Sequence, residues 1–249
     1  MNKFNNATKL KKIHLVRHKI HQIKRSEYLK ILILRTIGNF LILSSIFMIA
    51  KTFYSPVKEE VRYFIDRQIK KQYFISTTKV KPPEEPKGLL AKAFDLKPIE
   101  FLTPEDPNFS VIIPKIGANS RVFANVDSSD EKIYLPILQK GVAQALGTAF
   151  PGEGGHIFLF AHSTDYFWNV GSYNAIFYLL HKLEVGDEVN IIYKGQKFVY
   201  RVIGKNVVDP LRVEYLTRKT NKEFLTLQTC WPPGTTLKRL LIFATRVSE

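Results

Sequence analysis

A run of apolar residues near the N-terminus, preceded by a dense cluster of basic residues, constrains this chain more than any other feature. Residues 36–50 carry no charge, and adding residues 31–35 brings the run to the roughly 20 residues that a membrane-spanning helix needs. The Arg35 side chain is expected to extend toward the headgroups at the membrane surface. We therefore expect a transmembrane anchor over residues 31–50.

The positive charge of the chain is concentrated before this anchor. Residues 1–35 hold ten Lys and Arg against one acid, so they supply +9 of the formal net charge of +15, and the other 214 residues hold +6. Lys and Arg mark the cytoplasmic flank of membrane helices. We expect residues 1–30 to form a basic cytoplasmic tail that contacts membrane lipid, in a single-pass protein of the cell membrane. No nucleic-acid partner is expected, because the charge is confined to this tail.

Two other interpretations of the apolar run are a cleaved signal peptide and a buried helix of a soluble protein. A signal peptide needs a small-x-small cleavage site, and none follows Ile46. A buried helix does not explain why the basic residues gather on one side. The sequence therefore favours an uncleaved anchor, with everything after Lys51 outside the cytoplasm.

The segment between the anchor and the first strand-like run is expected to contain a juxtamembrane helix and a linker, over residues 51–108. Residues 57–74 place apolar side chains at mostly helical spacing opposite a charged face, which predicts a helix. Residues 76–108 are rich in Lys, Glu, Pro and Thr, which is typical of a semi-extended linker.

From Phe109 to the C-terminus, short apolar runs alternate with Gly, Pro, Asn and Asp, which predicts an all-β domain over residues 109–249. Residues 173–182 are expected to form the one good internal helix. Seven or eight strands with so little helix are typical of a β-sandwich or a closed barrel. The predicted strands are 109–113, 121–126, 156–161, 188–193, 197–203, 224–230 and 239–246.

The single cysteine, Cys230, lies at the end of one predicted strand. A lone cysteine outside the cytoplasm cannot form an internal disulfide, and the plain interpretation is a buried, inert side chain. Arg239 begins the next strand after an eight-residue turn containing Pro and Gly. Antiparallel pairing of these strands would place Cys230 beside Arg239. His162 also follows a strand end.

These three residue types suffice for acyl transfer through a thioester. A neighbouring His or Arg favours the thiolate, which is the reactive form of the cysteine. A His can protonate the departing amine, and a fixed Arg can donate hydrogen bonds to the oxygen that becomes an oxyanion. The expected catalytic residues are therefore His162, Cys230 and Arg239.

Four ordered motifs resemble those of the sortase family. The segment TLQTCWPPGTTLKRLLIFATR (226–246) is similar to the family signature TLxTC…R, and GGHIFLFAHS (154–163) resembles its catalytic histidine strand, with Ala161 replacing the usual Gly. FSVIIPKIGANSRVF (109–123) and GVAQALGTAFPGEGG (141–155) resemble the opening strand and the approach to the histidine. The resemblance implies a closed eight-stranded sortase-type β-barrel with one or two short helices, and it assigns Cys230, His162 and Arg239 to the catalytic positions.

Two further residues are expected to support the site. Thr229 precedes the cysteine and is expected to orient the oxyanion region through its backbone or hydroxyl, and Asp165 is expected either to orient the imidazole of His162 or to remain a solvated loop residue. His156 and His181 are expected to be structural. No metal or cofactor is expected, since the three histidines of the basic tail (His14, His18 and His21) lie in surroundings that repel cations.

The expected function is that of a cysteine transpeptidase. It would cleave a sorting-signal peptide in secreted proteins and transfer the acyl part to an amine on the cell wall or on another protein. The alternatives are another extracytoplasmic cysteine peptidase, an L,D-transpeptidase, or a catalytically silent binding module on a stalk. An L,D-transpeptidase places its cysteine in a Ser-x-Gly-Cys setting, whereas Cys230 follows Leu-Gln-Thr.

Overall fold

The computed structural model describes residues 25–76, 99–163 and 176–247. The chain divides into two compact units, with the boundary between Thr52 and Phe53. The second unit contains the β-barrel and everything that packs on it, and it holds the candidate site.

Helix α2 (Arg25–Gln68) joins the predicted anchor and the predicted juxtamembrane helix into one element. Its segment Arg25–Tyr54 is long and apolar enough to cross a membrane, and none of its most apolar stretch is buried within the protein. The helix predicted over residues 57–74 is wrong at its C-terminal end. Lys70 adopts a positive φ of 49°, which stops the helix, and strand β1 (Gln72–Ile75) follows.

Strand β1 pairs in parallel with β2 (Ile99–Leu102) in a two-stranded sheet. The linker predicted over residues 76–108 is therefore wrong at residues 99–102, while residues 77–98 lie outside the described part of the chain. The Lys71 ammonium forms an ion pair with Glu100, which joins the end of the helix to β2. Short apolar runs inside a Pro-rich segment are easily missed, because pairing rather than composition makes them strands.

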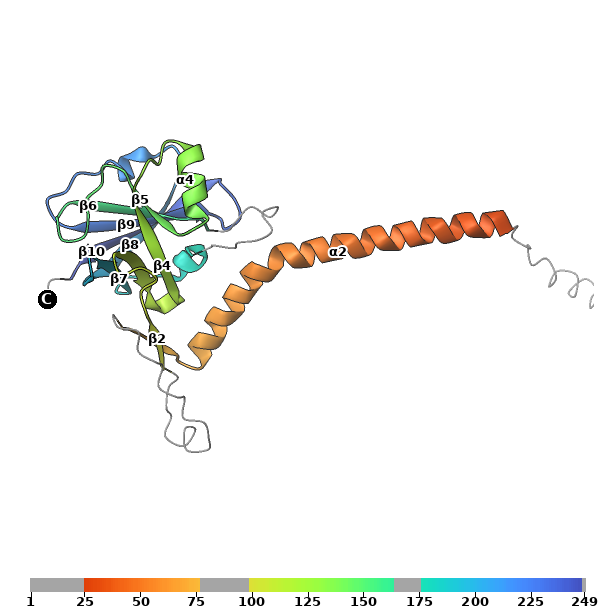
Figure 1. Ribbon diagram of the computed structural model, residues 1–249, viewed down its shortest axis with the longest axis horizontal. Helices are drawn as coiled ribbons and strands as arrows, with labels where there is room; N and C mark the ends of the chain where they lie inside the picture. Colours follow the sequence, from red (N-terminus) through yellow and green to blue (C-terminus); the bar gives the residue numbers. More distant parts are fainter. Residues whose placement is uncertain (1–24, 77–98, 164–175, 248–249) are drawn as a thin grey trace, which may run out of the picture. The chain divides into compact units, whose positions relative to one another are not determined.

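The remaining eight strands close into a barrel in the order β10-β8-β7-β3-β4-β5-β6-β9. Figure 1 labels strands β4 to β10 of this barrel and the helix α4 beside it. The predicted eight-stranded barrel is confirmed. Strand β9 lies between β6, its parallel neighbour, and β10, its antiparallel neighbour. The bounds are β3 Phe109–Ile113, β4 Ala118–Val126, β5 Val142–Ala145, β6 His156–Phe160, β7 Glu188–Tyr193, β8 Gln196–Val208, β9 Phe224–Trp231 and β10 Lys238–Arg246.

Short helices fill the connections of the barrel. They are η1 (Pro114–Ile116), α4 (Glu131–Leu138), η2 (Tyr178–Lys182) and η3 (Val213–Tyr215). The predicted helix over residues 173–182 is wrong in its described part, which is a turn followed by the 3₁₀ helix η2. The α-helix α4 was not predicted, because Pro136 in its interior hides it. A side-chain cap at Asp130, which accepts from the Lys132 amide at 2.9 Å, marks its start.

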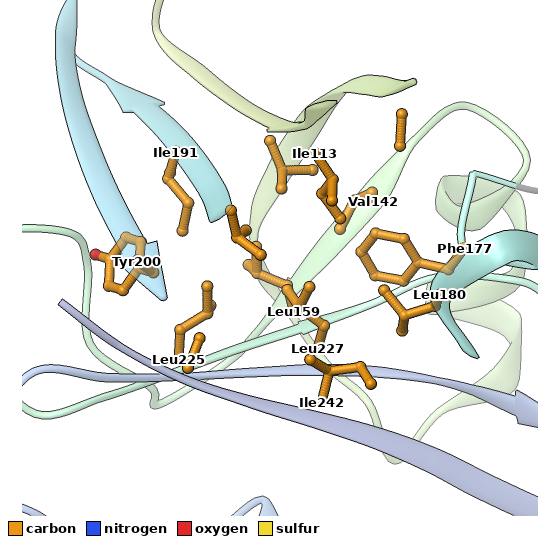
Figure 2. Packing of buried hydrophobic residues seen from close by; sticks show 14 of the residues in the cluster. Ile113, Val142, Leu159, Phe177, Leu180, Ile191, Tyr200, Leu225, Leu227 and Ile242 are labelled. Atoms are coloured by element: carbon orange, nitrogen blue, oxygen red, sulfur yellow. The ribbon is translucent and has the colours of Figure 1, made fainter. Parts of the chain in front are cut away.

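Alternate residues of the strands fill the barrel interior, as Figure 2 shows for Leu159, Leu225, Leu227 and Ile242. A second, smaller cluster lies on the outer face of β5 and β6, where Phe158 and Phe160 pack with residues of α4 such as Leu138. The two clusters show that β6 is apolar on both faces. One face supports the barrel core and the other supports α4.

The last turns of α2 pack on the barrel next to η1. The Arg62 guanidinium donates through Nη2 to the Ile116 carbonyl oxygen at 3.1 Å and is held by Glu59 at 2.6 Å. This approach depends on Gly117, which has a φ of +61°; a Cβ there would clash with Nη1 of Arg62 and lie 3.4 Å from the Tyr73 hydroxyl. A glycine is therefore required both by the backbone and by the docked helix.

Gly117→Ala should destabilise the protein more than Gly195→Ala. Both glycines have a positive φ, but nothing lies within 4 Å of a Cβ at Gly195. The left-handed backbone costs each variant about 1 kcal/mol. Gly117→Ala should lose about 1 kcal/mol more, because Arg62 must leave the Ile116 carbonyl. The measurement is the free energy of unfolding of the full chain in micelles; equal losses in the two variants would show that the Arg62 contact contributes nothing.

Candidate active site

Cys230 and Arg239 are direct cross-strand partners on β9 and β10. The turn between them, which contains Gly234 with a φ of +82°, reverses the chain so that the end of one strand meets the start of the next. Directly paired residues of antiparallel strands project to the same face, with Cβ atoms about 5 Å apart. The thiol and the guanidinium thus lie side by side at one rim of the barrel.

His162 lies at the same rim, after the end of β6. The parallel β6–β9 register runs from His156 opposite Phe224 to Phe160 opposite Gln228, a constant offset of 68 residues. The backbone bond from the Ala161 amide to the Gln228 carbonyl, at 3.1 Å, continues it by one residue. The next step of the same offset puts His162 opposite Cys230, and neighbouring strands are about 4.8 Å apart.

His162, Cys230 and Arg239 form a row of neighbouring backbone positions, and the side chains of Cys230 and Arg239 lie on the outer face of the barrel. Leu227 on β9 and Leu240 on β10 belong to the interior core, and side chains alternate along a strand. Cys230 is an odd number of residues from Leu227, and Arg239 is adjacent to Leu240, so both project outward. The candidate site is therefore on the barrel wall and not inside the barrel.

The environment of Cys230 both disfavours and favours its thiolate. Burial raises the pKa of the thiol above its ordinary value, and the positive charge of Arg239 acts in the opposite direction. Burial has the larger effect, so the net pKa is raised. The unliganded protein consequently holds Cys230 mainly as the thiol at neutral pH, and Arg239 limits the cost of forming the thiolate.

The guanidinium of Arg239 is oriented by the turn that precedes it. Its Nη1 donates to the Thr236 carbonyl at 3.1 Å and to the Lys238 carbonyl at 3.2 Å. The same turn is fixed at its start by Thr235, whose hydroxyl donates to the Pro232 carbonyl at 2.8 Å. The direction of the guanidinium therefore depends on the shape of this turn.

Thr229 connects the two strands that carry Cys230 and His162. Its side chain is buried, and its hydroxyl donates to the Ala161 carbonyl at 2.9 Å. This bond joins the residue before the cysteine to the residue before the histidine. Thr229 was singled out as an orienting residue, and this contact gives the hydroxyl a definite partner.

Two residues that the sequence did not single out hold the rim in place. Trp231 packs on the barrel core and its ring lies 5.4 Å from that of His181 on η2. The Lys205 ammonium donates to the carbonyls of His181 and Leu183, at 2.9 and 3.0 Å, and so fixes the end of η2. Trp231 could have been noticed as the residue after the cysteine, whereas nothing in the sequence distinguishes Lys205 from other exposed lysines.

His156 lies far from this row. It is at the opposite end of β6, with its Nε2 2.9 Å from the Thr226 hydroxyl, and burial lowers its pKa to about 4. It is thus a neutral structural residue at physiological pH. Asp165 lies outside the described residues. Within the described ranges, no group of three or more His, Cys, Asp and Glu side chains is placed to hold a metal ion.

A thiol beside a guanidinium, with an imidazole on the neighbouring strand, supplies the groups that thiol-dependent acyl transfer requires. Comparison with known proteins identifies the family. The model of the sortase domain matches residues 111–247, which is more than half of the chain. The chain belongs to the sortase family, whose members are cysteine transpeptidases.

Individual sortases show the extent of the similarity. The chain is 28% identical to sortase D of Bacillus subtilis (strain 168) over 191 residues, which are 74% of this chain and 88% of that protein. Among solved structures, sortase C1 of GBS pilus island 1 is 30% identical, with a TM-score of 0.47, over 57% of this chain and 64% of that one. The sortase D5 transpeptidase of Clostridium perfringens is 21% identical, with a TM-score of 0.46, over 66% and 91%.

Thr229→Val should disturb the site, whereas Thr226→Val should not. Both hydroxyls are buried on β9 and hydrogen-bonded, so each variant should lose about 1–2 kcal/mol of stability. Only Thr229 joins the strand ends that carry Cys230 and His162. The rate of Cys230 alkylation should change in Thr229→Val alone; the same rate in both variants and the wild type would exclude a positioning role for this hydroxyl.

The pKa of Cys230 should rise further in Arg239→Ala, because the variant loses the positive charge that lowers it. The measurement is the alkylation rate of Cys230 against pH, whose midpoint should move to higher pH. Arg246→Ala is the matched control, since Arg246 lies at the far end of the same strand and should leave the midpoint in place. A midpoint that stays constant or falls in Arg239→Ala would contradict the assigned proximity of the two groups.

Proposed function

We propose that this chain is a membrane-anchored sortase that cleaves a sorting-signal peptide in secreted proteins and transfers the acyl part to an amine. This proposal rests on the cross-strand pair of Cys230 and Arg239 in a chain of the sortase family. In this proposal Cys230 is the nucleophile, His162 moves the proton and Arg239 stabilises the oxyanion.

In the first half of the reaction, the Cys230 thiolate attacks the scissile carbonyl carbon. Negative charge develops on the carbonyl oxygen, and the guanidinium of Arg239 donates hydrogen bonds to it. The C–N bond then breaks, and protonated His162 gives its proton to the departing amine. The product is a thioester on Cys230 and a released C-terminal peptide.

In the second half, the acceptor amine attacks the thioester carbonyl. Neutral His162 takes the proton that the amine loses, and the Cys230 thiolate departs as the new amide forms. The proton balance closes, because His162 ends each cycle protonated. Because the raised pKa makes the thiolate the minor form in the unliganded protein, the cycle begins when neutral His162 takes the thiol proton. This transfer gives the thiolate and the protonated His162 that the first half uses.

The substrates proposed for this site are secreted proteins with a C-terminal sorting motif. The acceptor is an amine on the cell wall or on another protein, which gives either surface anchoring or pilus assembly. The anchor and basic tail support a single-pass membrane protein with the N-terminus in the cytoplasm.

Cys230→Ala should abolish both cleavage and transfer without unfolding the domain. The test uses a peptide from the C-terminal motif of a secreted protein of the same genome, with and without a primary-amine peptide as acceptor. Mass spectrometry should show an adduct on Cys230 in the wild type alone.

In the same assay, Arg239→Lys should be nearly as inactive as Arg239→Ala, because an ammonium cannot reproduce the planar fork of the guanidinium.

The expected loss in both Arg239 variants is about 10²–10³-fold in turnover, roughly 3–4 kcal/mol of transition-state stabilisation. Arg246→Lys is the control on the same strand and should retain activity. Near-wild-type turnover in Arg239→Lys would reduce Arg239 to a source of positive charge. Cleavage that is unaffected by the acceptor would indicate a cysteine peptidase instead of a transpeptidase.

A further inference from the structure

The part of α2 that packs near the barrel has a continuous apolar face that nothing in the described structure covers. We refer to it as the outer stripe, and its side chains are between 49% and 61% exposed. Their spacing of three, four and seven residues places them on one side of the helix. The outer stripe consists of Phe53, Val57, Val61, Phe64 and Ile65.

The opposite side of the same helix is the side that contacts the barrel. Tyr63 packs against the barrel core, and Glu59 holds the Arg62 guanidinium at 2.6 Å. Arg62 reaches the Ile116 carbonyl. With about 100° per residue, this contact side is centred roughly 180° from the outer stripe. Glu60, which forms an ion pair with Lys182 at 3.1 Å, lies at one edge of the stripe. The barrel therefore approaches one border, while the apolar side chains of the stripe stay exposed.

The outer stripe continues the apolar segment of the same helix. It begins at Phe53, within the segment Arg25–Tyr54 that is apolar enough to span a membrane. Pro56 lies three residues after Phe53, inside α2. A proline inside a helix removes one backbone hydrogen bond and allows the helix to change direction.

The width and the borders of the stripe indicate its partner. It spans about 120° of the helix, which is wider than the narrow seam of a coiled coil. Exposed basic residues border it at Lys51, Lys58 and Arg67, as in helices that lie in the plane of an anionic membrane surface. A lipid surface fits this combination better than a second copy of the helix.

We propose that α2 beyond Pro56 lies in the interface of the bilayer, with the outer stripe in contact with lipid and the barrel on the aqueous side. This inference rests on the proposed membrane anchoring and extends it, because the chain would meet the membrane along two segments instead of one. The barrel would then be held by a helix parallel to the surface, which limits how far its rim can turn away from the membrane.

The test uses the full chain in liposomes of phosphatidylcholine and phosphatidylglycerol. In a Cys230→Ala background, single cysteines replace Val57, Val61 or Phe64 and carry a nitroxide. Collisions with a water-soluble nickel complex should be several-fold rarer than at a label on Val185, which is 73% exposed on a barrel loop. Collisions with oxygen, which concentrates in lipid, should be several-fold more frequent than at Val185.

A label at Ile42, inside the apolar segment, separates the two parts of the argument. If Ile42 is protected from nickel and the stripe labels are as accessible as Val185, the interfacial helix is excluded while the anchor stands. An accessible Ile42 would remove the anchor and this inference together. Stripe labels that are shielded from both nickel and oxygen, with spin–spin coupling that disappears on dilution, would instead show a second copy of the chain on the stripe.

Discussion

The register between β6, β9 and β10 is the constraint on which the rest of the site depends. Strand β9 is held in parallel by β6 and in antiparallel by β10, so a single residue position on β9 fixes its neighbours on both sides. A slip of one residue would turn Cys230 into the core and Leu227 toward solvent. Burial of Leu225 and Leu227 therefore sets the reactive row as firmly as any contact within the row.

Local patterns in the sequence were sufficient for most of the strands and for one half of the site. Short apolar runs, separated by Gly, Pro, Asn and Asp, predicted the strands. The turn between Cys230 and Arg239 is short enough to predict that their strands pair. The parallel contact of β6 with β9 is different, because it joins residues 68 positions apart and no local signal encodes it. His162 was placed at the site by its strand end and by the family resemblance.

The errors in the predicted fold have specific physical causes. Strand β5 has only four residues, two of them alanine, and its pairing with β4 and β6 supplies what its composition lacks. Helix α4 contains Pro136, and η2 has an apolar sequence that suits an α-helix but packs as a 3₁₀ turn against the core. In each case a tertiary contact outweighs the local preference.

Because the reactive row lies on the outer barrel wall, the residues of β9 that pack the core are different from those that face the site. Residues of β9 that point inward, such as Leu225 and Leu227, are constrained by packing in the core. Gln228 and Cys230 point outward and are constrained by the reaction at the barrel wall. Substitutions in the outward set leave the core volume unchanged. A barrel of this design can change what it recognises over evolutionary time without repacking its interior, so specificity and stability can diverge independently.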